Sequence, residues 1–278
     1  MAVRASKDSI WPYGRIAWHF GYRSNDHDEE EKTFLGKTGN FNGKDVIEII
    51  CREPETARFV CTRLFQFFVA DEVNEDGYQL IETMMATYFA SRYEIRSMLR
   101  TMLNSDYFKS EKTWFARVKA PVEHIVGAIR LAGTYRTPTH GVEQIANHSF
   151  YMGQRLLDPP SVEGWHEGTE WIDSGALVER INFVSKELGN VSNPGVRSII
   201  ERIAISNGHA LSPDELVDRC LDLLGPITVS AEVQATLVKH VAQRGEVDLR
   251  DHQQRDELEQ RVGELLSLIA STREFQLA

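Results

Sequence analysis

The sequence has few residues that point to chemistry. It contains three cysteines, Cys51, Cys61 and Cys220, and no two of them stand in a CxxC spacing. An odd number of widely separated cysteines argues against both a disulfide framework and a zinc site. All three stand among apolar neighbours in helical patterns, so we expect them to be buried free thiols.

Long hydrophobic runs are also missing. The longest strongly apolar stretch runs from Leu64 to Ala70 and is interrupted by Gln66, whereas a membrane-spanning helix needs about 20 apolar residues. Arg4 and Lys7 stand near the start, but no apolar stretch typical of a signal peptide follows them. The sequence therefore predicts no membrane span and no signal peptide, and it leaves the localisation open.

Positive charge is in deficit. The chain of 278 residues has 31 lysines and arginines against 41 acidic residues, a formal net charge of −10. This balance argues against a general nucleic-acid binder, which needs a basic face, and against docking on an anionic membrane. Hydrophobic residues make up 42% of the chain, which is typical of a folded protein. The length suits one large domain or two small ones.

The hydrophobic pattern predicts an all-α fold. Apolar residues recur at steps of three and four, the spacing of one helical face, in Ala57–Phe68, Ile81–Phe89, Ile95–Leu103, Val122–Ile129, Ile181–Leu188, Ile199–Ile205, Leu216–Leu224, Val229–Val241 and Leu258–Ile269. No alternating pattern of useful length predicts a strand. We expect an irregular array of many helices with two long ordered loops.

Three segments break the helical pattern. They are Trp11–Asn42, Leu157–Asp173 and the short Gly189–Pro194, and all three are rich in residues that end helices. Long loops inside a compact domain are often functional. We place a domain boundary at the third break. It separates a helical body, residues 1–190, from a C-terminal helical subdomain, residues 191–278, packed on it.

Start and stop signals support the predicted helices. Pro54 and Pro213 suit a first helical turn, and Ser212 with Glu215 three residues later predicts a capping box. Three apolar runs are each followed by a glycine, and a glycine often marks the C-terminal end of a helix. These glycines are Gly133, Gly189 and Gly225.

One short pattern occurs twice. Leu99–Phe108 and Leu266–Phe275 both contain an apolar helix end, then a hydroxyl residue (Ser105 or Thr272), then a phenylalanine three residues later. We interpret each copy as a helix stop with a hydroxyl cap, whose phenylalanine folds back on the core. Two distant copies do not make a solenoid.

The glycine-rich segment 34–43 contains Gly36-Lys37-Thr38, which suggests a phosphate-binding loop. The Walker pattern requires a glycine where this chain has Glu31, and no strand pattern precedes it. We favour a glycine-rich turn that leads to a helix near Asp45, capped by Asn42 or Gly43.

The acidic run Asp26-His27-Asp28-Glu29-Glu30-Glu31 offers ligands for a hard divalent cation. The metal candidates are Asp26, His27 and Asp28. The run lacks the glycine and the alternate spacing of a calcium-binding EF-hand, and acidic runs are more often solvated loops. No other cofactor is predicted.

The segment 158–171 gathers the most distinctive side chains. Trp165 and Trp171 are candidates for stacking on a sugar or another planar ligand, and Glu163, His166 and Glu167 are candidate acid–base residues. The alternative is that the tryptophans pin an irregular loop to the helical body, and we favour that alternative.

Ordered motifs along the chain resemble one family of large bacterial proteins, domain of unknown function 1800. They are His27-Asp28, Lys32–Gly36, Gly39–Ile47, Ala57–Val69, Tyr93–Arg96, Leu99–Phe108, Val118–Glu123 and Pro159–Ile172. The resemblance covers Trp18–Phe183 well and Glu274–Leu277 weakly. Asp106 and Arg273 stand where the family's helix-stop pattern has proline.

The resemblance implies a mainly helical fold but no established activity and no assigned catalytic residues. It points to the C-terminal half of the family's domain. Family members commonly look exported and are often encoded beside a sulfatase-like family, domain of unknown function 1501. The implied partner is therefore another protein, either the missing N-terminal half or such a neighbouring product.

Two functional hypotheses follow, and whether the chain is an enzyme stays open. The preferred hypothesis is a non-catalytic helical module that works with another polypeptide. The alternative is a hydrolase acting on an extracellular polymer or its fragments. Its site would lie between the 34–43 and 158–173 loops and use Asp28, Lys37, Glu163, His166 and Glu167.

Overall fold

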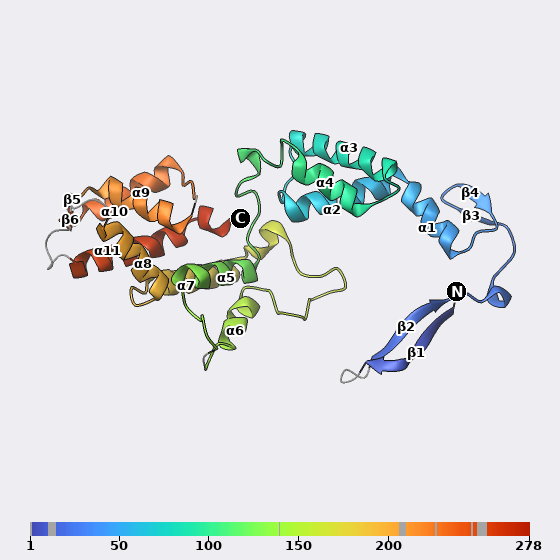
Figure 1. Cartoon of the computed structure of the whole chain (residues 1–278), viewed down its shortest axis with the longest axis horizontal. Coiled ribbons are helices and arrows are strands. Elements are labelled where there is room, and N and C mark those ends of the chain that lie inside the picture. Colours follow the sequence, from blue (N-terminus) through green and yellow to red (C-terminus); the bar gives the residue numbers. More distant parts are fainter. Residues whose placement is uncertain are drawn as a thin grey trace. The chain divides into compact units, whose positions relative to one another are not determined.

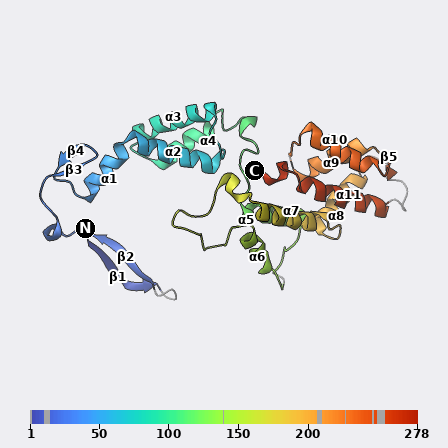
Figure 2. The same ribbon diagram turned by 180° about the vertical axis from the view of Figure 1, so that it is seen from behind.

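The computed structural model of the chain describes residues 2–10, 15–138, 140–205, 210–225, 227–245, 247–248 and 255–278. Backbone contacts divide the chain into two compact units. The first contains residues 1–68 and 73–109, and the second contains residues 69–72 and 110–278. Helices dominate both units (Figures 1 and 2), which confirms the predicted all-α class. None of the described helices is both long and apolar enough to span a membrane.

Two β-hairpins precede the helices of the first unit, and the sequence pattern does not predict them. β1 (Ala2–Ile10) pairs antiparallel with β2 (Arg15–Gly21), and β3 (Lys32–Phe34) pairs with β4 (Lys37–Gly39). The described part of 11–42 contains no α-helix, as predicted, but it contains three of these strands. β3 and β4 have three residues each and are too short to show alternation. β1 and β2 have nine and seven residues, so for them the prediction of no strand of useful length is wrong. Residues 11–14 of that segment lie outside the described residues.

Four helices form the body of the first unit: α1 (Gly43–Arg52), α2 (Pro54–Phe68), α3 (Glu75–Ala90) and α4 (Ile95–Asn104). The last three bury one shared set of side chains, namely Ala57, Cys61, Phe65, Leu80, Ile81, Met84, Met85, Tyr88, Met98 and Met102. The Tyr88 hydroxyl donates a 2.9 Å hydrogen bond to the carbonyl of Cys51 and so fixes the end of α1 against α3.

The second unit contains α5 (Pro121–Ala132), α6 (Gln144–Tyr151), α7 (Ser174–Gly189), α8 (Pro194–Ile205), α9 (Pro213–Leu224), α10 (Ala231–Ala242) and α11 (Arg255–Ala270). Short elements complete it: β5 (Ala210–Leu211), β6 (Val247–Asp248) and the 3-10 turns η2 (Glu111–Thr113), η3 (Gly168–Trp171) and η5 (Glu274–Gln276).

Helix ends lie where the start and stop signals predict them. α2 begins at Pro54 and α9 begins at Pro213, and Ser212 and Glu215 form the expected capping box. Asn42 caps α1 by the same device, since its side chain accepts from the backbone of Lys44 and Asp45. Gly133 ends α5 in the left-handed conformation at φ 71°, which favours glycine.

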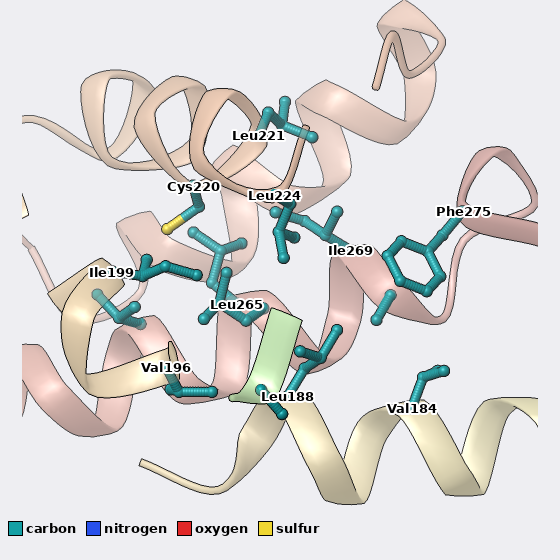
Figure 3. Close-up of a cluster of buried hydrophobic side chains, with 14 of the residues drawn as sticks. Val184, Leu188, Val196, Ile199, Cys220, Leu221, Leu224, Leu265, Ile269 and Phe275 are labelled. Carbon is teal, nitrogen blue, oxygen red and sulfur yellow. The ribbon is translucent and has the colours of Figure 1, made fainter. Parts of the chain in front are cut away.

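One core joins most helices of the second unit (Figure 3). It contains Val184 and Leu188 from α7 together with Cys220 from α9 and Leu265 from α11. The expected subdomain 191–278 thus shares its core with α5 and α7 of the expected body 1–190. The domain boundary at residue 190 itself stays a prediction.

The cysteines are free thiols, as predicted. Cys61 and Cys220 are buried, and burial raises the pKa of the Cys61 thiol to about 11 and that of Cys220 to about 12. Cys51 differs from the prediction because it is only half-buried. Elevated thiol pKa values keep the two buried side chains protonated and inert.

The repeated helix-stop pattern has the predicted hydroxyl cap in both copies. The Ser105 hydroxyl donates to the Met102 carbonyl at 2.7 Å and accepts from the backbone of Phe108 at 3.1 Å. The Thr272 hydroxyl makes the same two bonds, to the Ile269 carbonyl at 2.8 Å and from the backbone of Phe275 at 3.4 Å. In each unit the hydroxyl ends the helix, but the two rings differ: Phe275 is buried in the core, as predicted, whereas Phe108 is only half-buried.

Candidate functional site

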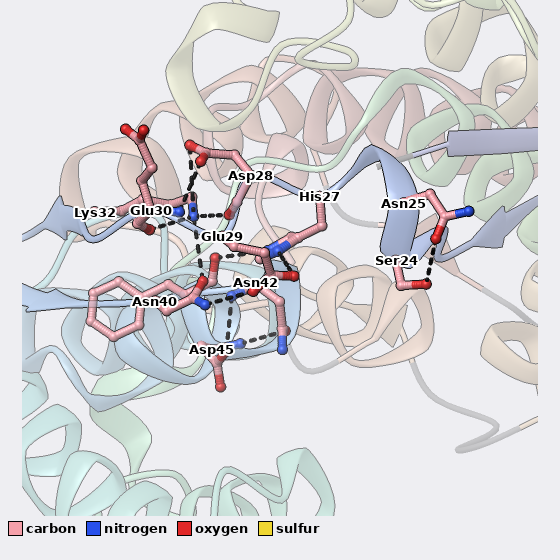
Figure 4. A network of polar contacts seen from close by, with 11 residues as sticks. Ser24, Asn25, His27, Asp28, Glu29, Glu30, Lys32, Asn40, Asn42 and Asp45 are labelled. Atoms are coloured by element: carbon pink, nitrogen blue, oxygen red, sulfur yellow. Dashed lines mark hydrogen bonds and ion pairs between the residues drawn. The ribbon is translucent and has the colours of Figure 1, made fainter.

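The acidic run of the first unit folds into a hydrogen-bonded turn (Figure 4). The His27 ring lies 3.2 Å from the Glu29 carboxylate and 3.3 Å from the Phe41 carbonyl. Asn40 donates to Glu29 at 2.8 Å, and this bond, followed by the one from His27, lowers the pKa of the Glu29 carboxyl. The Glu29 carboxylate is therefore held by groups of the protein itself.

The three metal candidates do not converge. Asp26 pairs with Arg23 at 3.3 Å, and Asp28 accepts from the backbone of Glu30 at 2.9 Å and lies 3.8 Å from the Lys32 ammonium. In the part of the chain that the structure describes, no group of three or more His, Cys, Asp or Glu side chains is arranged to hold a metal ion.

Lys37 belongs to a hairpin and not to a phosphate-binding loop. Leu35 and Gly36 form the turn between β3 and β4 at φ 47° and φ 74°, and Lys37 begins the following strand. The Lys37 ammonium lies 3.3 Å from the Glu53 carboxylate. A phosphate-binding loop leads from a strand directly into a helix N-terminus, whereas Gly36-Lys37-Thr38 leads into a strand. The predicted glycine-rich turn and its Asn42 cap are confirmed.

The second unit holds the tryptophan-rich loop. Trp171 is 5% exposed, and the Trp165 indole N–H donates to the Arg155 carbonyl at 3.1 Å. Burial of Trp171 removes its ring from solvent, which agrees with the packing alternative. Stacking of a ligand on Trp165 stays a prediction.

The acid–base candidates of this loop lie on its outside. Glu163 is exposed, and His166 pairs with Glu170 at 3.2 Å and meets the edge of Trp171 with ring centroids 6.1 Å apart. Glu167 is also exposed and precedes Gly168. Their catalytic roles stay predictions. Asp28 and Lys37 belong to the first unit, whereas the candidates of this loop belong to the second.

A carboxylate that sequence reasoning missed lies beside this loop. A Cβ added to Gly168 would meet the Asp71 side chain at 3.2 Å. Asp71 accepts a 2.7 Å hydrogen bond from the backbone of Val118. Desolvation raises the pKa of the Asp71 carboxyl, against the lowering effects of that bond and of Arg117. Nothing in the sequence around Asp71 signals this contact, because all of its partners are distant along the chain.

A buried cationic cluster is the second feature that the sequence does not reveal. Arg180 of α7 is fully buried, and its guanidinium donates to the Gln276 side chain and to the Lys119 carbonyl, each at 2.8 Å. The Lys119 ammonium donates to the Phe275 carbonyl at 2.7 Å. The His124 ring, 1% exposed, lies 3.2 Å from the Arg180 carbonyl.

The cluster is strongly perturbed by burial. Desolvation, with the neighbouring Arg180 charge, lowers the pKa of Lys119 to about 8 and that of His124 to about 3. Desolvation also lowers the pKa of Arg180 to about 10. These groups tie α5, α7 and the C-terminal segment together, and the backbone pair Val118–Leu277 adds to that connection. We interpret the cluster as structural.

A groove of about 650 Å³ lies between the end of α7 and the first half of α11. Gly189 and Gly263 line it where the two helices approach closely, and Lys186 and Glu259 are among its charged lining residues. None of the candidate residues of the tryptophan-rich loop lines it. The groove is open, and charged side chains stand among its lining residues.

Comparison with known proteins gives one family. The family model described as Protein of unknown function (DUF1800) matches residues 12–277. Neither curated proteins nor solved structures give a match. The match spans both units, so every candidate residue above lies within the family's sequence pattern.

Proposed function

The chain belongs to the DUF1800 family of proteins of unknown function, and from its structure we propose that it is a helical interaction module that works bound to another polypeptide. One observation carries the proposal: α2 exposes two phenylalanines on the side opposite its buried side chains. Ala57, Cys61 and Phe65 face the core and are fully buried. On the opposite side Phe59 is 67% exposed and Phe67 is 62% exposed.

This pattern is unusual for a surface helix. A surface helix has one apolar stripe and a polar outer face, whereas the outer side of α2 carries these two rings beside Arg63 and Gln66. Phe59 and Phe67 are spaced by two helical turns and so lie on one side of α2. Covering two phenylalanines of this exposure is a favourable contribution to binding, since large aromatic side chains dominate interface energetics.

The proposed partner is a second polypeptide. It is either one that carries the family's N-terminal half or the product of a neighbouring gene of the sulfatase-like family. Both assignments come from the family resemblance.

The test is co-expression of the full chain with each of these two proteins, followed by size-exclusion chromatography. We expect co-elution with one of them and loss of co-elution in the Phe59→Glu/Phe67→Glu variant. The matched control is Gln79→Glu/Thr83→Glu, which adds the same charge on the exposed side of α3. Circular dichroism checks that both variants fold. A chain that stays monomeric with both proteins argues against the proposal.

A hydrolase remains the alternative, and one observation favours it. A carboxyl group with a raised pKa, Asp71, lies beside the loop that carries the candidate Glu167. Two carboxyl groups in different environments are the usual requirement for acid–base hydrolysis. A screen against polysaccharides, sulfate esters and peptides tests it. Activity lost in Asp71→Asn and Glu167→Gln supports a hydrolase, and no activity in the wild type rejects it for those substrates.

A further inference from the structure

Both units contain the same three-helix arrangement. In the first unit α2, α3 and α4 each contact the other two, and in the second unit α9, α10 and α11 do the same. We call these sets the first and second trio. Each trio begins with a helix whose first residue is proline, Pro54 or Pro213, and each ends in the hydroxyl turn before Phe108 or Phe275.

The buried positions of the two trios correspond at one constant offset within each helix. The matched pairs, all buried, are Ala57 with Leu216, Cys61 with Cys220, Phe65 with Leu224, Ile81 with Leu237, Met85 with Val241, Met98 with Leu265 and Met102 with Ile269. The N-caps of the middle helices also match. The Asn74 side chain accepts from the backbone of Gly77, and the Ser230 side chain accepts from Val233 at the same spacing. The trios are two copies of one motif.

In the second trio, one side of the last helix is covered by α7. The Ser185 hydroxyl of α7 lies 2.9 Å from that of Ser271, and a Cβ on Gly189 would meet the side chain of Ser267 at 3.3 Å. Flanking this contact, Val262, Leu266 and Ala270 are all fully buried.

In the first trio, the matching side of α4 is open. Ile95, the counterpart of Val262, is 45% exposed, and Leu103, the counterpart of Ala270, is 41% exposed. Leu99 between them is half-buried. The three side chains form one stripe because they are spaced four residues apart. We call them the α4 stripe.

The border of the α4 stripe shows what kind of partner fits. Arg96 and Arg100 stand where α11 has Gly263 and Ser267. The small residues of α11 let α7 approach closely. The two arginines of α4 are too large for such a close approach of a neighbouring helix, and they present positive charge. Both arginines are exposed, and neither forms an ion pair with any residue that the structure describes.

We propose that the α4 stripe with Arg96 and Arg100 binds an amphipathic helix of another polypeptide, one that carries carboxylates along one edge. Its apolar side contacts Ile95, Leu99 and Leu103, whose counterparts on α11 are buried beside the α7 contact, and its acidic residues pair with the two arginines. This inference rests on the proposed function and names the surface and the chemistry of the partner.

The experiment is site-specific photo-crosslinking of the full chain in its native cell, with p-benzoylphenylalanine in place of Leu103. Mass spectrometry identifies the crosslinked peptide. We expect a segment of another protein with helical apolar spacing and at least two acidic residues along one edge. The Arg96→Glu/Arg100→Glu variant lowers the crosslink yield by about tenfold or more, since reversing the charges replaces attraction by repulsion.

The matched control is Arg136→Glu/Arg197→Glu, which makes the same charge change at two exposed positions of the second unit and keeps the yield. A crosslink to this chain itself, to a second copy of it, or to a segment without acidic residues overturns the inference. So does a yield that charge reversal leaves unchanged. If co-expression yields a complex while these crosslinks fail, the interaction module stands and only this surface is wrong.

Discussion

The guanidinium Nε of Arg180 donates a 2.8 Å hydrogen bond to the side-chain oxygen of Gln276, which lies 96 positions later in the chain. Both side chains are buried. The bond joins the middle of α7 to the C-terminal segment just after Phe275. Because buried hydrogen bonds to charged groups are costly to leave unmade, this pair is a main point of attachment for the end of the chain.

The first prediction concerns this pair. Gln276→Ala and Arg180→Met each lower the free energy of unfolding, because each leaves a buried polar partner unsatisfied. In a double-mutant cycle we expect a coupling free energy of about 1–3 kcal/mol. Urea denaturation followed by circular dichroism measures it. Additive effects of the two substitutions would show that the pair contributes nothing beyond its separate contacts.

The second prediction is a pH dependence from His124. Burial lowers the pKa of this ring from 6.5 to about 3 in the folded chain. Between these two values the unfolded chain binds the extra proton, so stability falls as the pH drops from 6.5 towards 3. The slope due to this residue approaches about 1.4 kcal/mol per pH unit in the middle of that window.

The variant His124→Gln tests that assignment because an amide can keep the bond to the Arg180 carbonyl but has no charge to gain. Urea midpoints between pH 6.5 and pH 5 are informative, since most carboxylates stay ionised there. The loss of stability over this interval is smaller in the variant than in the wild type. Equal losses would assign the pH dependence to other groups.

The third prediction compares two glycines. A Cβ on Gly195 would lie 1.9 Å from the carbonyl oxygen of Leu131, so α8 begins in direct backbone contact with the end of α5. Gly195→Ala therefore forces the two helices apart and destabilises the second unit by more than about 3 kcal/mol. Gly127→Ala is the control, because a Cβ there meets nothing within 4 Å. It raises stability by up to about 1 kcal/mol. A stable, fully folded Gly195→Ala chain would contradict the backbone contact.

The sequence predicts features whose cause is local. The caps at Asn42 and Ser212 and the two hydroxyl turns before Phe108 and Phe275 are all formed by residues within a few positions of one another. Helical periodicity likewise predicts the helix class, because burial on one side repeats every three to four residues.

Features that depend on residues far apart in the chain cannot be predicted from local patterns in this way. The contact of Arg180 with Gln276 and that of Asp71 with Val118 join positions with no local signal. The hairpin around Gly36 is too short to show alternation. The repeat of three helices is visible in sequence mainly at its hydroxyl turns, because most of its matched buried residues, apart from Cys61 and Cys220, keep their positions but not their identities.

The fourth prediction concerns the acidic turn. Lys32 lies against Asp28, and Glu29 is held by Asn40 and His27. A cation at Asp26, His27 and Asp28 would have to displace these donors, so we expect no change in Tm of the untagged chain with millimolar calcium or magnesium. A bound cation at a hundred times its Kd would add about 2.7 kcal/mol. A Tm rise that disappears in Asp28→Asn would establish the metal site.

The fifth prediction uses the matched hydroxyl turns. Ser105→Ala removes two hydrogen bonds in the first unit, and Thr272→Val removes the equivalent two in the second. Each substitution costs about 1 kcal/mol because a carbonyl and an N–H lose the same partner. Hydrogen exchange separates the units: Ser105→Ala speeds exchange in α4, and Thr272→Val speeds exchange in α11. The control Ser97→Ala removes a hydroxyl that donates to the exposed Glu94 side chain, and it leaves both helices unchanged. If Ser105→Ala leaves exchange in α4 unchanged, the Ser105 hydroxyl does not end α4. The same holds for Thr272→Val and α11.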